Sequence, residues 1–377
     1  VVDNASGDGS FEMLRPREKD IVLVASPTNS GFAGGCNLGV RHSSGEIVAF
    51  LNNDAKPDTR WVSAALESFD AYDNVGAVAS QVLNWEGTHV DFSGAGMTWY
   101  GMGYRPLTGT KVSKKTQHPT PVLFGTGSAM FVRRNVFEEL GGFDESFFMF
   151  FEDVDFGWRL NLAGYTYLYQ PQSIAFHRYH GSMGGIPQHR EQFLLERNAL
   201  SCLYKNLDDA QLQRILPGAL LASVKRAVVE SGVDTTHFDL ARGSTSSGST
   251  EVSSDALVPL FAMDQFVDAL PELMPKRTAI QSTRKRSDAA IWRLFGETNA
   301  AMSTDARYLR GYDAIVEAFG VTNDPPALNV LIVTGDPIGK KLSGPGIRAW
   351  HMAEALSVSH DVTLVSLTSV DEALSSA

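Results

Sequence analysis

The sequence predicts an α/β fold over its first part, followed by a helical region and then one β-α-β unit. Strand-like apolar runs and helix-like stretches alternate as far as about residue 205, a pattern typical of a largely parallel sheet covered by helices. From residue 206 onward, apolar residues recur at every third or fourth position, as in amphipathic helices. A chain of 377 residues is long enough for two or three folding units.

The first region, residues 1–205, is expected to hold the sheet and its covering helices. Strands are predicted at Ile21–Ala25, Glu46–Leu51, Val75–Val82, Pro121–Val132, and Thr166–Tyr169 with Ile174–Phe176. Helices are predicted at Gly34–Ser43, Thr59–Tyr72, Arg134–Leu140 and Glu152–Leu162. Glycines follow the last two helices, as they often do where a chain leaves a helix.

The chain begins with Val1-Val2-Asp3, which reads as the tail of a buried strand that leads straight into a turn. Residue 1 is not Met, and such a strand would need partners upstream. We therefore expect the first domain to be truncated at its N-terminus and the chain to be part of a longer protein.

Residues 206–326 are expected to form a helical extension. Helices are predicted at Ala210–Ser231, Ala256–Leu273 and Ser287–Phe319. The segment Gly243–Ser254 is almost free of apolar residues and is predicted to be a flexible loop. Asn323-Asp324-Pro325-Pro326 marks the boundary of this extension.

Residues 327–377 read as the opening of a second, Rossmann-like domain. A continuous apolar strand, Leu328–Thr334, leads into a glycine-rich loop, Gly335–Gly346. A helix at Ile347–Leu356 and a strand at Asp361–Ser366 follow. One such unit cannot close a sheet of its own.

The composition limits the partners of the chain. Its net charge of −11 argues against nucleic acid as the main partner, because a phosphate backbone would be repelled. Cys36 and Cys202 lie too far apart in the chain for a metal-ligand spacing, which favours a reduced, cytoplasmic setting. No apolar run reaches the roughly 18–20 residues that span a bilayer.

The densest group of carboxylates is Glu152-Asp153-Val154-Asp155, which aromatic residues flank on both sides. On a helix that starts near Glu152, Asp155 can pair with Arg159 four residues later. Glu152 and Asp153 then lie in the first turn, where the helix dipole favours the ionised form that a general base needs. The alternative is an acidic first turn on a solvated helix.

Possible metal ligands follow two other strands. Asp54 ends the run Phe50–Asp54, directly after a predicted strand, and Mg²⁺ or Mn²⁺ typically take one or two carboxylates plus substrate phosphates. His177 follows the strand Ile174–Phe176, with His180 three residues later. A helix N-cap for Asp54 and a structural role for His177 are the alternatives.

Two turn-rich segments could contact a nucleotide. Asp3 ends the first strand, where a carboxylate in an open α/β sheet points into the ligand crevice. The segment Asn29–Asn37 has the glycines that allow close approach of a backbone, ahead of a helix N-terminus that favours anions. It matches neither the dinucleotide-binding nor the P-loop pattern. Ordinary turns and caps are the alternative for both segments.

Together these segments resemble glycosyltransferase family 2, which has the GT-A fold, and most closely its rhamnosyltransferase-like and galactofuranosyltransferase-like branch. The resemblance covers roughly Val1 to Asn206. It rests on the combination of VVDNASGDGS, NSGFAGGCNLG, FLNND, GTGSAMFVRR and GGFDESFFMFFEDVDFGWR with the later His177. Each piece is weak alone, whereas the combination is specific.

The resemblance implies a role for each matching residue. Asp153 would be the base that deprotonates the acceptor hydroxyl, with Glu152 beside it. Asp54 and His177 would bind Mg²⁺ or Mn²⁺, although the first Asp of the family's D-x-D motif is Asn52 here. The residues implied in binding the donor or other substrate groups are Asp3, Asn29, Gly34, Asn37, Asn53, Gly127 and Trp158.

The implied reaction is an inverting transfer of a sugar from a dTDP- or UDP-sugar to a hydroxyl of a glycan or lipid-linked acceptor, in cell-surface polysaccharide synthesis. The family's first strand and nucleotide-holding loop are not found in this sequence. A non-catalytic GT-A scaffold is therefore a second hypothesis, and a nucleotidyltransferase, which would need a basic triphosphate loop, is a third.

Two further segments carry weaker resemblances. The tail around Gly344-Pro345-Gly346-Ile347-Arg348 resembles the start of a GT-B glycosyltransferase. A basic cluster, formed by Lys276, Arg277 and Arg284–Arg286, could contact anionic lipid at the inner face of the plasma membrane, although a solvated basic face is the simpler interpretation.

Overall fold

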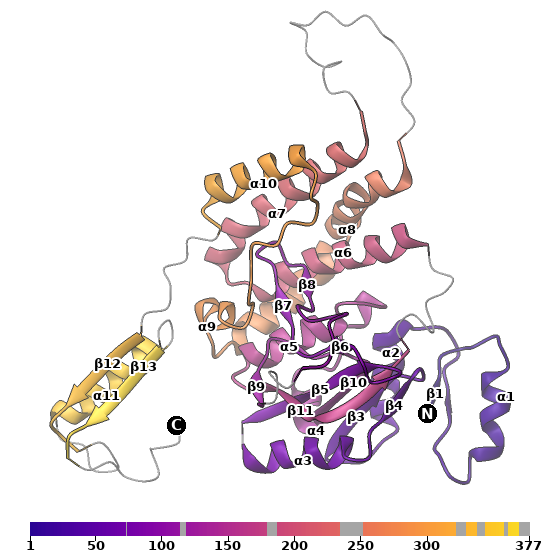
Figure 1. The fold of residues 1–377 in the computed structure, drawn as a ribbon, viewed down its shortest axis with the longest axis horizontal. Coiled ribbons are helices and arrows are strands. Elements are labelled where there is room, and N and C mark those ends of the chain that lie inside the picture. The colour runs from indigo at the N-terminus through magenta and orange to yellow at the C-terminus, as the bar shows by residue number, and fades with distance from the viewer. Residues whose placement is uncertain are drawn as a thin grey trace, which may run out of the picture.

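The computed structural model describes residues 1–72, 74–113, 118–178, 187–233, 252–321, 329–337, 344–357 and 361–368. An α/β part and a set of longer helices pack together into one body, and the C-terminal β-α-β unit lies to one side of it (Figure 1). The alternation of strands and helices expected for the first region is therefore confirmed.

A seven-stranded sheet lies at the centre of the α/β part. Five of its strands follow the order β3-β10-β5-β11-β4, while β6 pairs with β5 and β9 pairs with β11. The strands are β3 (Ile47–Leu51), β4 (Ala55–Pro57), β5 (Val75–Asn84), β6 (Val90–Phe92), β9 (Thr120–Pro121), β10 (Ala129–Arg133) and β11 (Thr166–His177).

The expectation of a largely parallel sheet is wrong for these strands. β5 and β11 are parallel, but β10 lies antiparallel between β3 and β5, and β4 lies antiparallel on β11. Buried apolar runs mark strands without giving their direction, so alternation with helices misled the prediction. The predicted strand Pro121–Val132 is also two strands, β9 and β10. As a result, the start of β10 lies beside the end of β3.

Four helices cover this sheet or end beside it: α2 (Gly31–Arg41), α3 (Trp61–Ala71), α4 (Arg134–Glu139) and α5 (Glu152–Leu162). The bounds of α5 match the prediction. α3 buries Trp61, Ala65 and Phe69, which share one face because they are four residues apart. The ring of Trp61 packs on that of Phe131 from β10 with 4.4 Å between centroids. Such contacts make the sheet a rigid support for the loops at its edge.

Two small sheets lie outside the main one. β1 (Val2–Asp3) pairs in parallel with β2 (Val24–Ala25), and the short helix α1 (Ser10–Leu14) lies between them in the chain. β7 (Gly96–Met97) pairs with β8 (Gly103–Tyr104). The predicted opening strand is thus present, but its partner is β2 rather than the main sheet.

The helical extension packs on the α/β part through a second hydrophobic core that includes Trp99, Leu203, Ile215 and Phe295. Its helices are α6 (Gln188–Asn206), α7 (Asp209–Glu230), α8 (Ser254–Thr283), α9 (Asp288–Trp292) and α10 (Ala306–Phe319). The predicted helix Ser287–Phe319 is therefore two helices, and α6 was not predicted. Of the predicted loop Gly243–Ser254, residues 243–251 lie outside the described residues, and Ser254 begins α8. Within the described residues, none of the helices is both long and apolar enough to cross a membrane.

The basic cluster of α8 and the residues after it makes contacts inside the protein. Arg277 donates to the carbonyl oxygens of Tyr204 and Leu207, and its guanidinium pairs with Asp209 at 2.5 Å. Arg284 pairs with Asp288 at 2.6 Å, and Arg286 donates to the carbonyl of Gly164 at 3.0 Å. Arg277 and Arg284 thus tie the end of α8 to α6, α7 and α9, and Arg286 contacts the α/β part, so neither a lipid surface nor a solvated face describes these three arginines.

The C-terminal unit consists of β12 (Asn329–Thr334), α11 (Gly344–Ser357) and β13 (Asp361–Ser366). β12 and β13 pair in parallel along their whole lengths. The predicted order of strand, helix and strand is confirmed, whereas residues 338–343 of the glycine-rich loop lie outside the described residues. That this unit opens a Rossmann-like or GT-B domain stays a prediction.

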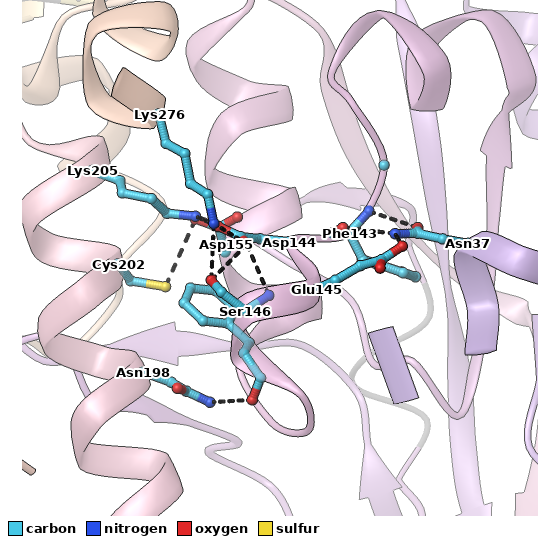
Figure 2. Close-up of polar contacts among 12 residues, drawn as sticks. Asn37, Phe143, Asp144, Glu145, Ser146, Asp155, Asn198, Cys202, Lys205 and Lys276 are labelled. Atoms are coloured by element: carbon cyan, nitrogen blue, oxygen red, sulfur yellow. Dashed lines mark hydrogen bonds and ion pairs between the residues drawn. The ribbon is translucent and has the colours of Figure 1, made fainter. Parts of the chain in front are cut away.

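A buried cluster of charges joins α6 and α8 to the segment that precedes α5 (Figure 2). The Nζ of Lys205 lies 2.6 Å from Asp144 Oδ2 and 2.9 Å from Asp155 Oδ1, and the Lys205 side chain is 1% exposed. Arg159 pairs with the other oxygen of Asp155 at 2.8 Å, as its spacing predicts. Burial raises the pKa of Asp144 and of Asp155, but the charge and hydrogen bonds of Lys205, together with those of their other partners, outweigh burial and lower both.

We predict that Lys205→Met strongly destabilises the protein. It leaves two buried carboxylates facing each other without their shared cation, and breaking a buried pair costs about 3–5 kcal/mol. Lys276→Met is the matched control. Lys276 also lies 2.6 Å from Asp144, but its side chain is 35% exposed, so we expect a loss of about 0–1 kcal/mol. Urea titrations at pH 7 measure both free energies of unfolding.

The same measurement at lower pH provides a second check. Because the folded pKa values of Asp144 and Asp155 lie below those of an unfolded chain, their contribution is complete above about pH 5 and is lost as the pH falls. The deficit of Lys205→Met should therefore shrink in acid. Equal losses for the two lysine variants would contradict the assignment.

Candidate functional site

Four elements meet at one edge of the main sheet. The end of β3 lies beside the start of β10, and the N–H of Asn52 donates to the carbonyl of Ser128 at 3.0 Å. The N–H of Gly127 donates to Asp153 Oδ2 at 2.9 Å, which places the start of α5 there. His177 at the end of β11 pairs with Ala55 of β4. The structure therefore brings together segments that are far apart in the sequence.

Asp153 lies in the first turn of α5 with part of its surface exposed. Its Oδ2 accepts from Gly127, and its Oδ1 accepts from the N–H of Val154 at 2.8 Å. Burial raises the pKa of Asp153, while these N–H groups and the charge of Arg105 oppose the rise. The expected dipole effect on the carboxylate is thus outweighed by burial. A carboxylate that is oriented by two N–H groups and made more basic by burial is suited to accept a proton.

Glu152 has a different environment from its neighbour. Its side chain is 5% exposed, and no hydrogen-bond partner for Oε2 is found among the described residues. Burial, followed by the charge of Asp153, raises the pKa of Glu152 well above its usual range. Burial and the neighbouring charge therefore favour the neutral form of Glu152 more strongly than that of Asp153. The expectation that the helix dipole keeps Glu152 ionised is wrong, because desolvation is the larger effect.

The loop before α5 has a strained backbone. Phe148, Phe150 and Phe151 have positive φ angles of 63°, 66° and 69°, a region that residues other than glycine rarely occupy. The amide of Asn198 on α6 donates to three carbonyls of this loop, the longest of the three contacts being 3.2 Å. Strain of this kind persists only where the surroundings fix it, and it clusters at functional sites.

His177 lies between two carboxylates. Its Nδ1 is 2.7 Å from Asp91 Oδ2, and its Nε2 is 3.1 Å from Asp54 Oδ1. Burial alone would lower the pKa of His177, but both carboxylates favour its charged form and raise it. Asp91 also pairs with Arg105 at 2.8 Å. The predicted neighbours Asp54 and His177 are therefore brought into contact, whereas His180 lies outside the described residues.

This arrangement fits a divalent cation in its donor atoms. A neutral His177 would donate Nδ1–H to Asp91 and turn the lone pair of Nε2 toward Asp54, the pattern in which a carboxylate orients a metal-binding imidazole. In the described residues, no group of three or more His, Cys, Asp or Glu side chains is arranged as a metal site. Mg²⁺ and Mn²⁺ need only one or two protein ligands when substrate phosphates supply the rest.

The segments predicted to face the donor nucleotide lie at the start of α2. Asn4 donates to Asn29 Oδ1 at 3.2 Å and to the carbonyl of Gly31 at 2.7 Å, so β1 is tied to α2. Asp3 is buried at the end of β1, and its Oδ2 accepts from the N–H of Ser6. Nucleotide contacts by Asp3 and Asn29 stay predictions. Gly34 is buried in α2 and packs on Ser30, which explains the glycine without a ligand.

Asn37 does not face a substrate. Its amide nitrogen donates to the carbonyl of Phe143 at 2.8 Å and to Glu145 Oε1 at 2.9 Å. Its amide oxygen accepts from the N–H of Phe143 at 3.0 Å. The predicted donor contact is wrong, because this buried side chain is used to fix the turn after α4 (Figure 2).

Trp158 does not face a substrate either. Its side chain is fully buried, and its ring meets that of Phe295 edge to face with 5.3 Å between centroids. It packs α5 against the residues that follow α9. Asn53 lies in an exposed turn, and the predicted substrate contacts of Asn53 and Gly127 stay predictions.

Comparisons with known proteins place the site in a family. A family model described as glycosyl transferase family 2 matches residues 1–141, and one described as glycosyl transferase family group 2 matches residues 86–233. Together the two matches span residues 1–233, and the chain is a glycosyltransferase similar to family 2 over these residues. The matched region contains every site residue discussed above, so the predicted resemblance is supported.

Curated relatives of the transferase agree with this. An N-acetylglucosaminyl-diphospho-decaprenol L-rhamnosyltransferase of Mycobacterium tuberculosis is 26% identical over 50% of this chain and 68% of its own length. The low-salt glycan biosynthesis hexosyltransferase Agl10 of Haloferax volcanii is 32% identical over 42% of this chain. The match covers 52% of the length of that relative. Among solved structures, a mannosyltransferase from Pyrobaculum calidifontis in complex with GDP-Man and Mn²⁺ is 18% identical to this chain, with a TM-score of 0.37. The match covers 86% of this chain and 76% of the mannosyltransferase chain.

Two residues of the transferase site were missed in the sequence. Asp91 and Arg105 come from β6 and from the loop after β8, segments that were not predicted as elements. A signal for Asp91 exists, since a single carboxylate stands between the apolar Val90 and Phe92 in a short strand-like run. No local signal marks Arg105, because its partner lies 14 residues away.

We predict that Gly31→Ala destabilises the transferase by about 2 kcal/mol or more. Gly31 has φ +70°, and an added Cβ would collide with the carbonyl of Phe148 and lie 2.7 Å from its ring. Both the strained φ and the displaced loop then contribute to the loss. The free energy of unfolding from chemical denaturation measures the effect.

Gly35→Ala is the matched control in the same helix. Its Cβ would meet Asn4 at 3.4 Å, an ordinary contact, and alanine stabilises a helix interior by about 1 kcal/mol relative to glycine. A destabilisation of Gly35→Ala as large as that of Gly31→Ala would show that α2 tolerates no added methyl group, and would remove the argument for close packing on Phe148.

Proposed function

We propose that the chain catalyses inverting, metal-dependent transfer of a sugar from a nucleotide-diphosphate sugar to a hydroxyl of a glycan or lipid-linked acceptor. The observation that carries the proposal is the oriented Asp153 carboxylate, held by Gly127 at the sheet edge where Asp54 and His177 meet. The rhamnosyl- and hexosyltransferase names of its relatives agree with a role in cell-surface polysaccharide or glycan assembly.

Asp153 would act as the base. The acceptor hydroxyl gives its proton to a carboxylate oxygen of Asp153 while its own oxygen attacks the anomeric carbon from the face opposite the departing diphosphate, so the configuration inverts. The neutral Glu152 adds no second negative charge, which would hinder approach of an anionic donor. The positive charge of Arg105 would favour the ionised form of Asp153 and so oppose the effect of burial.

Asp54 and His177 would hold the divalent cation, with Asp91 orienting the imidazole. When bound, Mg²⁺ or Mn²⁺ supplies a Lewis acid for the charge that develops on the diphosphate. An acidic chain needs such a local source of positive charge for its donor. The donor would be a dTDP- or UDP-sugar, and the reaction would take place in the cytoplasm, at or near the inner face of the plasma membrane.

The first test is Asp153→Asn. Loss of the base should lower turnover about 10²–10⁴-fold, measured as release of nucleoside diphosphate from a panel of dTDP- and UDP-sugars. Because burial disfavours the charge of Asp153, the variant should unfold at the same or a higher temperature than the parent, so the loss cannot come from unfolding. Asp70→Asn, an exposed change on α3, is the control. Normal turnover in Asp153→Asn would rule out Asp153 as the base.

The second test concerns the metal. Removing the imidazole in His177→Ala should weaken binding of Mn²⁺ in the presence of UDP or dTDP at least tenfold, measured by calorimetry. Asp91→Asn should weaken it about 10–100-fold, as is usual for a residue that orients a metal ligand. His42→Ala removes an exposed imidazole that contacts only a helix carbonyl in the described residues, and should bind Mn²⁺ normally. Unchanged affinity in both site variants contradicts the assignment.

A further inference from the structure

A cavity of about 430 Å³ lies beside the main sheet, where the pairing of β11 with β5 is interrupted. Gln170 of β11 pairs with Ser80. The next pair is Ile174 with Gln81, so residues 171–173 of β11 are inserted without partners on β5. Such irregularities often lie next to binding sites, because they redirect the side chains around them.

The insertion is held in place by residues at the start of α3. Ser173 is fully buried, and its Oγ donates to the carbonyl of Trp61 at 2.8 Å. Arg60 donates to Gln172 Oε1 at 3.3 Å, and the N–H of Arg60 donates to Asp58 Oδ1 at 3.0 Å. Asp58, Arg60 and Gln172 all line the cavity. Its walls are therefore tied to one another as well as to the sheet.

Gln81 supplies an unpaired amide to the cavity. The residue is 7% exposed, and its side chain has no hydrogen-bond partner among the described residues. Gln170 is exposed to the same extent, but its amide donates to Ser68 Oγ at 2.9 Å and accepts from the N–H of Gln172 at 3.2 Å. An amide left unpaired in a buried position is destabilising. The two donors and the acceptor of Gln81 are therefore available to a ligand.

The rest of the lining favours a ligand that is neutral and partly apolar. Among its described residues, Asp58 and Arg60 carry charge, and the two charges cancel. A phosphate would therefore find no net positive charge here. The apolar side chains of the lining are Leu83, Val112, Pro171 and Ile174. A sugar ring matches this surface, because its hydroxyls can bond to the amides and the carboxylate while its C–H groups pack on the apolar side chains.

We propose that this cavity binds a neutral sugar unit of a glycan. Ile174 lies three residues before His177 on β11, a distance of about 10 Å along a strand. Asp153 is held by Gly127, just before β10, which lies on the other side of β5 from β11. A donor sugar placed between the cation and Asp153 would therefore not fill the cavity. That the glycan is the acceptor, bound through a unit that does not react, rests on the proposed transferase function.

The test is titration of the whole chain by saturation-transfer NMR with four neutral sugars: N-acetylglucosamine, methyl α-rhamnoside, methyl α-mannoside and lactose. At least one should bind, and Gln81→Leu should weaken its binding about tenfold, the effect of losing about two hydrogen bonds. Gln170→Leu is the matched control, because it removes an equally buried amide that does not line the cavity, and it should bind the sugar normally. UDP with Mn²⁺ should bind to Gln81→Leu within about twofold of the parent.

Melting curves of the same variants show whether each change acts on the ligand or on the fold. Gln81→Leu removes an unpaired amide and should melt at the same or a higher temperature than the parent. Gln170→Leu leaves Ser68 and the N–H of Gln172 without their partner and should melt at a lower temperature.

Each result decides the proposal. A parent chain that binds none of the four sugars, or equal sugar binding by the parent and Gln81→Leu, overturns it. A lower melting temperature for Gln81→Leu overturns it as well, because the amide would then have a partner in the fold. Weaker binding of UDP to Gln81→Leu assigns the cavity to the donor and overturns the glycan site. Since the sugar titrations contain neither donor nor metal, their result stands whether or not Asp153→Asn loses turnover.

Discussion

The buried contact of Lys205 with Asp144 and Asp155 is the constraint on which the site depends. Asp144 belongs to the turn after α4, and Asp155 belongs to the first turn of α5 together with Asp153. The loop between these two carboxylates is thus fixed at both ends by one cation from α6. Buried charges are costly unless paired, so the segment has few alternative positions that satisfy all of them.

This constraint also ties the helical extension to the candidate site. The family similarity ends at residue 233, but Lys276 on α8 shares Asp144 with Lys205. Asn198 on α6 bonds to the carbonyls of the loop in which three phenylalanines have positive φ. Helices outside the sheet therefore hold the strained backbone that presents Asp153 and buries Glu152. Each strained residue costs about 1–3 kcal/mol, which the packing of two cores can absorb.

Local features of the site could be read from the sequence, and non-local ones could not. The span Glu152–Leu162 and the pair of Asp155 with Arg159 were predictable because helix spacing alone determines them. Strand direction was not, since an apolar run looks the same in either direction. Asn37 and Trp158 were misassigned because a motif marks a residue as important without showing its partners. Their partners in the structure, Phe143 for Asn37 and Phe295 for Trp158, give both residues a structural role. The interpretation of the basic cluster at and after the end of α8 was wrong for the same reason, because its partners could not be read from the sequence.

The residues that complete the site are those whose partners lie on other strands. Arg105 pairs with Asp91, whose second oxygen contacts His177, and the positive charge of Arg105 also opposes the rise in the pKa of Asp153. One guanidinium therefore acts on both the carboxylate that would accept the proton and the imidazole that would bind the metal. Neither effect follows from a motif, because both arise only when β6, β8 and β11 come together at the sheet edge. The site is thus a property of the assembled sheet, and its motifs supply only the groups that titrate.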